Sequence, residues 1–378
     1  MRRMIGRRRL LQGTGIALAF TPAGTAFADL LRQERAPQNL ATPITRFDRL
    51  ITPTPDFFVR SHFGPPALDR SRPLSVEGLV TNKLTLTAAE LEKSFKPVTV
   101  TAVLQCAGNG RALHVPRVPG IQWVHGAMGQ ATFTGVRLRD LLEKAGVAPE
   151  NLKGTFVHLL GADAPPKPQT PVFLRSIPIE RALDPSTLVA YRMNGEELTL
   201  GHGAPLRLVV PGWAGDHWVK WLTKIAVEKE EAKGFFMQTA YRMPTEKVEP
   251  GAAVPPEKMR SATTFPVKSI IGAPADGAHT PPGLQKVVGV AFSGDAPIAK
   301  VEVSIDDGKT WRVAKLEGEP GAGRWVVFTH EFERKEAGRV RALARATDKK
   351  GNAQPEHAAW NPSGYFWNGW HSVSWEIA

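Results

Sequence analysis

Residues 98–111 read VTVTAVLQCAGNGR, and the interpretation of the whole chain starts from this stretch. The alternating β-branched residues of its first half predict a half-buried strand, and the Gly-Asn-Gly loop that follows brings the only cysteine, Cys106, near Arg111. A single cysteine cannot form an internal disulfide. At the end of a strand its thiolate is placed as a nucleophile or a soft metal ligand. The alternative is a buried cysteine that acts as a small apolar side chain, and Gly108 and Gly110, which allow a large group to come close, argue against it.

The segment LQCAGNGR, residues 104–111, resembles the cysteine loop of the sulfite oxidase family of molybdenum enzymes. In that family the cysteine ligates molybdenum, so the resemblance implies that Cys106 is the protein ligand of a Mo-molybdopterin cofactor. It also implies a fold, namely an α+β sulfite-oxidase-like molybdopterin domain over residues 29–243. An immunoglobulin-like antiparallel β-sandwich over residues 260–378, which makes a dimer interface in the family, would follow it.

Composition agrees with two soluble globular domains. The chain has 378 residues, of which 42% are hydrophobic and 22% charged. Its formal net charge of +12 includes five arginines in residues 1–28, a segment without acidic residues. A moderately basic protein attracts anionic substrates or acidic partners. We expect no nucleic-acid binding, because no basic run is interleaved with aromatic residues.

The N-terminal segment has the order of an export signal. Arginines at positions 7–9 precede an apolar run over residues 14–27, which ends in Ala-Phe-Ala. Two arginines followed by two leucines resemble the twin-arginine signal for export of folded proteins, and an ordinary export signal is the alternative. We therefore expect residues 1–28 to be a signal and the protein to be periplasmic. No other segment approaches the ~18 consecutive apolar residues of a membrane span.

The segment FFVRSHFGPP, residues 57–66, delivers Arg60 and His62 to a turn that Gly-Pro-Pro ends. It resembles the family segment that passes under the metal. The resemblance implies that Arg60 faces an oxyanion substrate, as Arg111 does, and that Phe58 and His62 touch the pterin. The alternative is a surface arginine beside a capping histidine.

Two isolated residues have family counterparts. Trp123 resembles a tryptophan of the substrate-pocket wall, although a plain core tryptophan is the alternative. Asp163 follows a predicted strand over residues 155–160, and the matching family aspartate hydrogen-bonds the pterin. An Asx-turn is the alternative for Asp163.

A second block, residues 201–221, matches the family strongly. A pterin phosphate needs cationic donors that converge from different loops. The resemblance assigns cofactor contacts to His202, Arg207, Trp218, Val219 and Lys220. Each cation alone would be interpreted as a surface charge or a satisfied histidine, and the ordered set favours the cofactor.

The chain has three tyrosines. Tyr241 resembles the active-site tyrosine of the family by its order after residues 219–221. Tyr191 precedes His202, which favours a structural role. Tyr365 belongs to a final segment, residues 364–371, that in the family returns to the first domain. Just before that segment the chain has Ser363 where animal members have a substrate-binding arginine, so the anion pocket is expected to depend on Arg60, Arg111, His62 and a further residue that fills the gap.

Short alternating strands predict the sandwich. A Pro-, Glu- and Lys-rich linker over residues 243–259 precedes them, and a turn at Asp306–Lys309 predicts a hairpin. The predicted strands cover residues 267–271, 286–292, 300–305, 311–316, 325–332 and 339–347.

These features predict a periplasmic sulfite dehydrogenase. Residues Cys106, Arg60, Arg111, Tyr241, His62 and Trp123 would form the catalytic pocket. The chain has no Cys-x-x-Cys-His haem site, so electrons are expected to pass to an external carrier such as a c-type cytochrome. Within the family the alternatives are a sulfane dehydrogenase and a methionine-sulfoxide reductase, the second of which normally lacks the sandwich. The alternative from another class is a cofactor-free periplasmic binding module.

Overall fold

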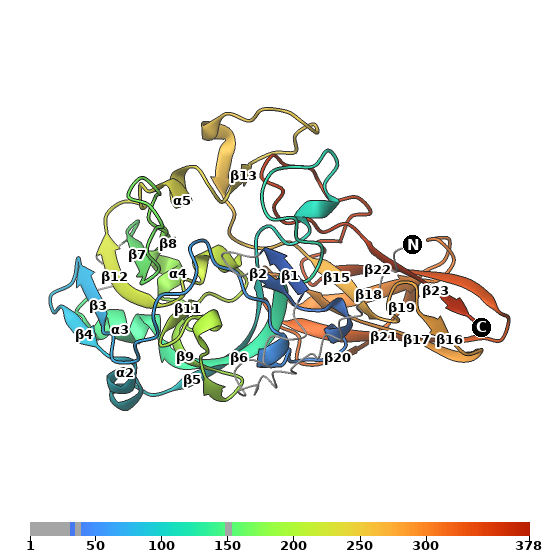
Figure 1. The fold of residues 1–378 in the computed structure, drawn as a ribbon, viewed down its shortest axis with the longest axis horizontal. Coiled ribbons are helices and arrows are strands. Elements are labelled where there is room, and N and C mark those ends of the chain that lie inside the picture. Colours follow the sequence, from blue (N-terminus) through green and yellow to red (C-terminus); the bar gives the residue numbers. More distant parts are fainter. Residues whose placement is uncertain (1–30, 35–38, 148–152) are drawn as a thin grey trace, which may run out of the picture.

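The computed structural model describes residues 31–34, 39–147 and 153–378, which form two bodies side by side (Figure 1). A mixed body lies on the left of Figure 1 and a β-sandwich on the right. The predicted export signal lies outside the described residues. Among the described helices, none has the length and apolar character needed to cross a lipid bilayer.

The first sheet of the mixed body carries the cysteine loop at the end of one edge strand. It is antiparallel, with the order β10-β9-β6-β5, and β11 also pairs with β9. The strands are β5 (Val98–Gln105), β6 (Met128–Arg137), β9 (Leu188–Met193), β10 (Glu196–Glu197) and β11 (Arg207–Val209). The predicted strand before Cys106 is therefore confirmed.

The second sheet of this body is mixed, because β12 pairs with β3 in parallel and with β7 antiparallel. Its order is β4-β3-β12-β7-β8. The strands are β3 (Leu74–Gly78), β4 (Leu84–Leu86), β7 (Phe156–Gly161), β8 (Leu174–Pro178) and β12 (Leu222–Glu228). The apolar core of the body includes side chains of both sheets.

The helices of this body are short. Thr87 caps α2 with a capping box to Glu90, and Gly146, at a φ of 83°, follows the end of α3. The α-helices are α2 (Ala88–Ser94), α3 (Leu138–Lys144), α4 (Ile179–Ala182) and α5 (Phe235–Gln238), and the 3-10 helices are η1 (Ile44–Arg46), η2 (Thr54–Asp56), η3 (Arg111–Leu113), η5 (Leu200–His202) and η6 (Gly215–His217), while η7 (Pro256–Lys258) lies in the linker between the bodies. Strands therefore dominate this body.

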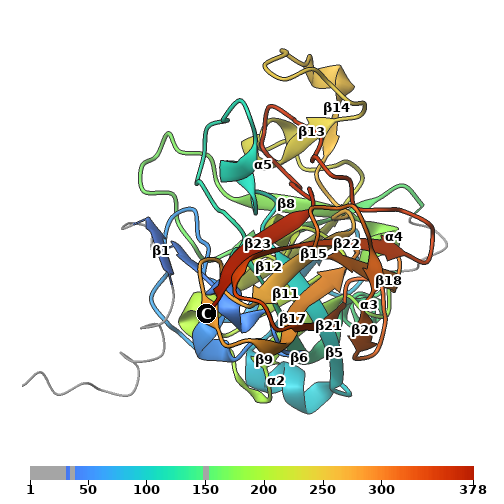
Figure 2. The same cartoon turned by 90° about the vertical axis from the view of Figure 1, so that its right-hand side faces the viewer.

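The C-terminal body consists of two packed sheets, seen end-on in Figure 2. One has the order β15-β17-β21-β20 and the other β16-β23-β22-β18-β19. Inward residues of both, such as Val287, Phe328 and Trp375, form one core. The strands are β15 (Lys268–Ala273), β16 (His279–Thr280), β17 (Gly283–Phe292), β18 (Ile298–Ser304), β19 (Arg312–Val313), β20 (Lys315–Glu317), β21 (Trp325–Arg334), β22 (Gly338–Asp348) and β23 (His371–Ile377).

Two details of the sandwich differ from the sequence prediction. The predicted strand 311–316 is two short strands, because β19 pairs with β18 and β20 pairs with β21 in the opposite sheet. The chain changes sheets at Ala314, whose buried side chain joins the sandwich core. The sequence analysis also missed β23, which pairs along its length with β22.

A continuous apolar interface joins the two bodies. Phe47, Val103 and Met128 pack in one cluster with Phe292 and Trp325 of the sandwich. Hydrogen bonds reinforce it, because the Gln130 side chain accepts from the Trp325 backbone N–H (2.7 Å) and donates to its carbonyl (3.3 Å). This interface fixes the base of the cysteine loop, since Val103 belongs to β5.

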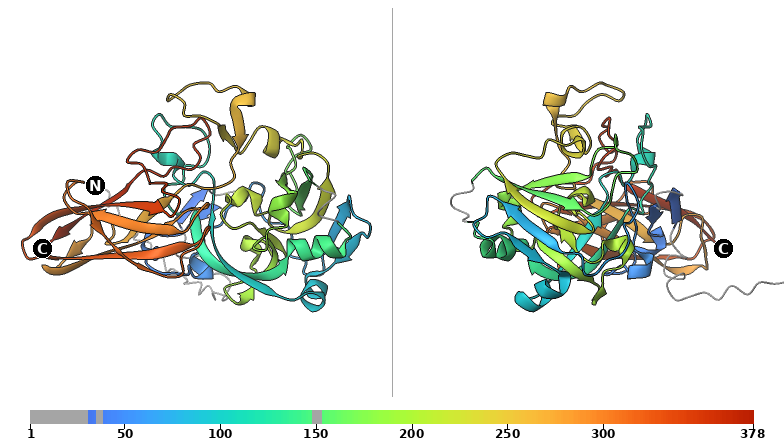
Figure 3. Two further views of the ribbon diagram at one scale, coloured as in Figure 1. Left: turned by 180° about the vertical axis from the view of Figure 1, so that it is seen from behind. Right: turned by 60° about the vertical axis from the view of Figure 1, so that its left-hand side comes forward.

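The linker between the bodies is an ordered ribbon that projects from the molecule in both views of Figure 3. Strands β13 (Arg242–Pro244) and β14 (Met259–Ser261) pair at its base. The segment before β23 returns to the mixed body, as the sequence predicts, and Phe366 N–H donates to the Ala107 carbonyl (2.9 Å). Tyr241, Cys106 and Tyr365 are therefore held near one junction.

Candidate active site

The loop that carries Cys106 is held by its own backbone and by one buried asparagine. Cys106 N–H donates to the Ala127 carbonyl (2.9 Å), and the Asn109 side chain accepts from Ala127 N–H (3.1 Å) and donates to Gln105 (3.3 Å). Gly110 adopts a φ of 94°, which an L side chain rarely tolerates. A Cβ at Gly110 would also lie 2.6 Å from Trp367 Cβ of the returning segment. The sulfur position is thus fixed by both bodies.

Cys106 lies at the junction of two pockets. The inner pocket extends toward residues 201–221, and the outer pocket extends toward Arg111. Four residues line both of them, namely Arg60, His62, Cys106 and Tyr241. A group bound to the sulfur can therefore extend inward while its opposite side faces the outer pocket.

Three predicted cofactor residues bring nitrogen donors to the inner pocket. Arg207 donates to the His202 carbonyl (2.9 Å), and Lys220 Nζ donates to the Gly201 carbonyl (3.0 Å). His202 Nδ1 lies 2.8 Å from the Thr199 hydroxyl. The donors come from η5, from β11 and from the loop before β12, which is the convergence that the sequence predicts.

The cations of the inner pocket are strongly desolvated. Burial lowers the pKa of Arg207 to about 9, and burial followed by the charge of Arg207 lowers the pKa of Lys220 well below its usual value. Burial also lowers the pKa of His202 to about 3, so His202 is neutral. Among the described ion pairs, none gives Arg207 or Lys220 a carboxylate partner within 4.0 Å, and Arg207 Nε is a buried donor without an acceptor. A bound anion such as a phosphate group would offset this unbalanced charge, so the residues fit the cofactor.

The remaining predicted cofactor residues complete the inner wall. Phe58, Trp218 and Val219 supply buried apolar surface, and Arg207 lies over the Trp218 ring at 5.7 Å. Burial raises the pKa of Asp163 to about 6. With that pKa the group is mostly a carboxylate at pH 7 and accepts hydrogen bonds, which suits the N–H groups of a heterocycle.

The outer pocket holds Arg111 in a fixed orientation. Its Nε donates to the Ser363 carbonyl (3.2 Å), and its Nη1 donates to the Ile121 carbonyl (3.2 Å). Gly120 has a φ of 114°, and a Cβ there would lie 2.6 Å from Arg111 Nη1. The loop is therefore shaped around the guanidinium. Trp123 lines the same pocket and is fully buried.

Arg60, His62 and Tyr241 form a hydrogen-bonded series between the pockets. Arg60 Nη2 lies 3.2 Å from His62 Nδ1, and His62 Nε2 lies 2.6 Å from the Tyr241 hydroxyl. Burial, followed by the charge of Arg60, lowers the pKa of His62 to about 2, so the ring is neutral. Arginine only donates, so Nδ1 must accept and the ring proton sits on Nε2. The Tyr241 oxygen accepts that proton's hydrogen bond, which leaves its own O–H hydrogen for another acceptor.

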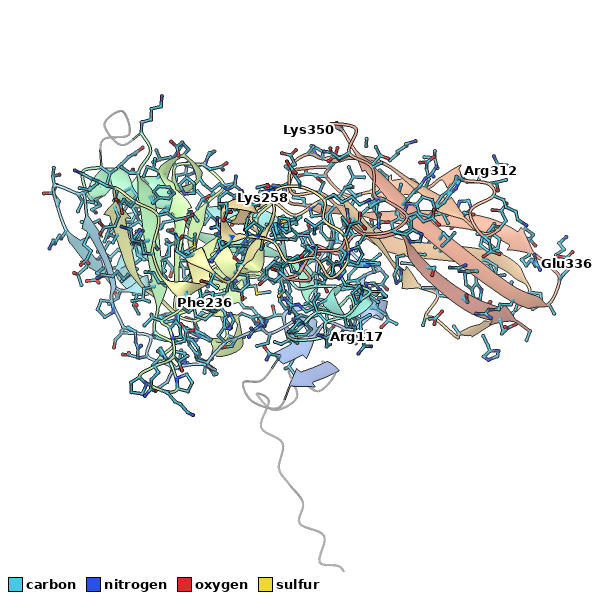
Figure 4. All side chains as sticks on the ribbon, turned by 90° about the horizontal axis from the view of Figure 1, so that it is seen from above. Arg117, Phe236, Lys258, Arg312, Glu336 and Lys350 are labelled. Atoms are coloured by element: carbon cyan, nitrogen blue, oxygen red, sulfur yellow. The ribbon has the colours of Figure 1, made fainter. Side chains whose placement is uncertain are left out.

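A buried ion pair that the sequence analysis missed supports Tyr241. Arg175 donates to Asp216 (2.6 Å) and to the Phe236 carbonyl, and its guanidinium lies 5.1 Å from the Tyr241 ring centroid. Phe236 packs against the His62 ring at 4.8 Å. Figure 4 labels Phe236 on the mixed body, away from Arg312 and Glu336 of the sandwich. The sequence carries no local signal for this pair, because β8 and η6 meet only in the fold.

The structure places every predicted site residue in the wall of one or both pockets. Ser363 also lines the outer pocket, but its hydroxyl donates to the Arg242 carbonyl (2.7 Å). The Ser363 side chain thus does not replace an arginine. Tyr365 lines the same pocket, and its ring lies 5.3 Å from the Arg111 guanidinium. Tyr191 is a buried core residue outside both pockets, as its position in the sequence favours.

Comparisons with known proteins agree with this geometry. Residues 62–236 match the family described as the oxidoreductase molybdopterin binding domain, and residues 259–377 match the Mo-co oxidoreductase dimerisation domain. Sulfite oxidase from Gallus gallus is 37% identical over 336 residues, which are 86% of this chain and 72% of that protein. Mitochondrial sulfite oxidase from Rattus norvegicus is 36% identical over 344 residues, and the match spans 62% of its length.

A solved structure is similar over nearly the whole chain. The sulfane dehydrogenase SoxCD from Paracoccus pantotrophus matches with a TM-score of 0.78 and 27% identity, covering 97% of this chain and 96% of that one. Together the matches argue against a cofactor-free binding module. With Cys106 at the junction of the two pockets and these matches over most of its length, the chain belongs to the sulfite oxidase family of molybdenum-dependent oxidoreductases.

Proposed function

We propose that the protein is a sulfite dehydrogenase that oxidises sulfite to sulfate with water as the oxygen source. The carrying observation is that Cys106 lies where the inner pocket, lined by unbalanced buried cations, meets an outer pocket lined by Arg60 and Arg111. The bound cofactor supplies a molybdenum that accepts the two electrons and exchanges oxygen with sulfite and water. Binding and orienting the sulfite falls on the side chains of the chain.

Substrate binding depends on Arg111 and Arg60. Both residues line the outer pocket, and charge-assisted hydrogen bonds to an oxyanion are stronger than neutral ones. The backbone carbonyls of Ser363 and Ile121 hold Arg111, so little side-chain freedom is lost when an anion binds.

Tyr241 and His62 place one hydrogen-bond donor beside the sulfur position. Burial raises the pKa of Tyr241 far above its usual range, so the phenol keeps its proton. Neutral His62 donates to the phenol oxygen and turns the O–H hydrogen away from itself. That hydrogen stabilises negative charge on an oxygen of the substrate or of the cofactor.

Purified protein tests the proposal directly. Molybdenum near one per chain, with sulfite-dependent reduction of ferricyanide, is the expected result. Protein that holds molybdenum but oxidises thiosulfate or reduces methionine sulfoxide, without sulfite turnover, would refute it.

A sulfane dehydrogenase is the second candidate, and the likeness to SoxCD over 97% of the chain favours it. Such an enzyme acts on sulfur bound to a carrier protein, so it needs an entrance wide enough for a carrier arm. Sulfite and a carrier-bound sulfane, compared at equal concentration, separate the two candidates. A higher kcat/KM for the carrier-bound sulfane would replace the first proposal by the second.

The proposal also covers the location, the electron acceptor and the oligomeric state of the enzyme. We infer export by the twin-arginine route, a periplasmic location, an external c-type cytochrome as acceptor, and a homodimer made through an immunoglobulin-like sandwich. The signal order of residues 1–28 and the match to the dimerisation domain support these inferences. Cell fractionation and light scattering test location and dimer. Turnover with ferricyanide but with no soluble cytochrome would count against the proposed acceptor.

A further inference from the structure

Three side chains of the outer pocket wall, Arg111, Tyr365 and Tyr241, contact one another in series, and the buried Arg175 lies behind Tyr241. The Arg111 guanidinium lies 5.3 Å from the Tyr365 ring centroid, and the two tyrosine rings are stacked at 5.7 Å with an interplanar angle of 7°. Arg175 lies 5.1 Å from the Tyr241 centroid. Both cations are within the distance at which a cation is attracted by a ring face.

Tyr365 is held firmly by its own segment. Asn361 accepts from Tyr365 N–H (3.0 Å) and donates to the Tyr365 carbonyl (2.8 Å). Gly364 has a φ of 62°, and a Cβ there would lie 2.8 Å from Arg111 Cγ. The backbone at this point is therefore fitted to Arg111, and Tyr365 reaches the pocket from a rigid support.

Tyr365 also supports Tyr241 directly. Tyr241 has a φ of 57°, a left-handed conformation that costs a bulky residue free energy unless its surroundings enforce it. The Tyr241 backbone N–H donates to the Tyr365 hydroxyl (3.3 Å), which is nearly buried. The phenol oxygen of Tyr365 thus satisfies a donor that the unusual backbone would otherwise leave without an acceptor.

We propose that Tyr365 is a positioning residue that orients Arg111 and Tyr241 toward a single oxyanion. The inference rests on the proposed function, since it assumes that the outer pocket binds a sulfur oxyanion. Ring contact with Arg111 governs affinity for the anion. The hydroxyl contact with Tyr241 governs turnover, because it fixes the donor that faces the reacting oxygen.

Three variants of the loaded enzyme separate these roles. Tyr365→Leu removes the ring, and loss of the cation contact should raise the dissociation constant for sulfate and the KM for sulfite about three- to thirtyfold. Tyr365→Phe keeps the ring and removes the hydroxyl. Sulfate affinity should then stay within about twofold, while kcat falls about five- to tenfold, the effect of one lost hydrogen bond. Tyr191→Phe is the matched control, because the Tyr191 hydroxyl is buried without a partner outside both pockets.

Equilibrium dialysis with labelled sulfate gives the affinity without turnover, and molybdenum content confirms loading. If wild-type enzyme binds sulfate but does not oxidise sulfite, the proposed function fails while the dialysis still tests Tyr365. Should Tyr365→Leu not retain molybdenum, Tyr365→Met replaces it. Sulfate affinity unchanged in the aliphatic variant, or kcat unchanged in Tyr365→Phe, overturns the proposal.

A double-mutant cycle sharpens the test. If Tyr365 acts on the anion through Arg111, the variant with both Arg111→Ala and Tyr365→Leu should bind sulfate within about twofold of Arg111→Ala alone. Losses that multiply in the double variant would show two independent contributions and would contradict the series of contacts.

Discussion

The inner and outer pockets share the Cys106 sulfur but treat cations in opposite ways. In the inner pocket, Arg207 is buried and Lys220 half-buried, and burial lowers the pKa of each. In the outer pocket, Arg111 is only partly buried and rests on backbone carbonyls and a tyrosine ring. The difference indicates that the inner cations suit a permanently bound anion, such as the cofactor phosphate, whereas Arg111 suits a substrate anion that is exchanged at every turnover.

Cys106→Ser should have the largest effect. The inner pocket is intact in this variant, so we expect most of the cofactor to be retained, but a hydroxyl is a poor ligand for a soft metal and sulfite oxidation should fall to background. Steady-state turnover and molybdenum content measure the two effects separately. Activity close to that of wild type would show that the sulfur is not needed.

Arg207→Met should weaken the binding of the cofactor but stabilise the cofactor-free protein. Protein purified with an active cofactor pathway should lose most of its molybdenum, because the buried anion loses a charge-assisted partner. Protein made without the cofactor should melt at a higher temperature than the wild type, because a desolvated charge without a carboxylate partner is removed.

The exposed Arg192 on neighbouring β9 provides the control variant Arg192→Met, for which neither change is expected. A lower melting temperature of cofactor-free Arg207→Met would mean that the inner cation is already balanced by the protein.

Arg111→Ala should leave the cofactor in place and weaken substrate binding. A charged hydrogen-bonding contact is worth ~1.5–3 kcal/mol, so the KM for sulfite should rise about ten- to a hundredfold. Arg117→Ala, an exposed arginine in the same loop and labelled in Figure 4, is the matched control. Loss of molybdenum in Arg111→Ala would show that Arg111, like Arg207, helps to hold the cofactor.

Lys268→Met should have the smallest effect. Lys268 lies outside both pockets, so this variant measures the effect of a buried cation that binds neither cofactor nor substrate. Lys268 Nζ is buried without a hydrogen-bond partner near His125, His371 and the Trp367 ring, and burial lowers its pKa to about 7 from 10.5. Between these values the unfolded chain binds more protons than the folded one, so the free energy of unfolding rises with pH.

The variant Lys268→Met should flatten that rise and be more stable than wild type near pH 7. The change is at most ~1.4 kcal/mol for each unit of the pKa shift. Chemical denaturation between pH 7 and 10 measures it, with the exposed Lys286→Met on adjacent β17 as control. An identical pH slope in Lys268→Met and wild type would show that Lys268 stays charged in the folded protein.

The contiguous parts of the site could be predicted from the sequence. Residues 98–111 contain both the strand pattern and the cysteine loop, and residues 201–221 contain the ordered cations, so the short-range pattern and the family resemblance reinforced each other. The capping box at Thr87 and the stop at Gly146 are likewise local signals.

Contacts between distant segments could not be predicted in the same way. Arg175 meets Asp216 and Phe236 only because β8, η6 and α5 pack together, and no spacing in the sequence indicates it. Tyr365 reaches Tyr241 across 124 residues. The strand 311–316 was predicted as continuous because it contains no glycine or proline, while the change of sheet at Ala314 depends on which partner strand is nearer.

The most direct test of the account is X-ray absorption at the molybdenum edge of the purified enzyme, compared with Cys106→Ser. The account predicts that the variant has one sulfur ligand fewer than wild type while its dithiolene sulfurs remain. An identical sulfur shell in both proteins would show that Cys106 does not bond the metal.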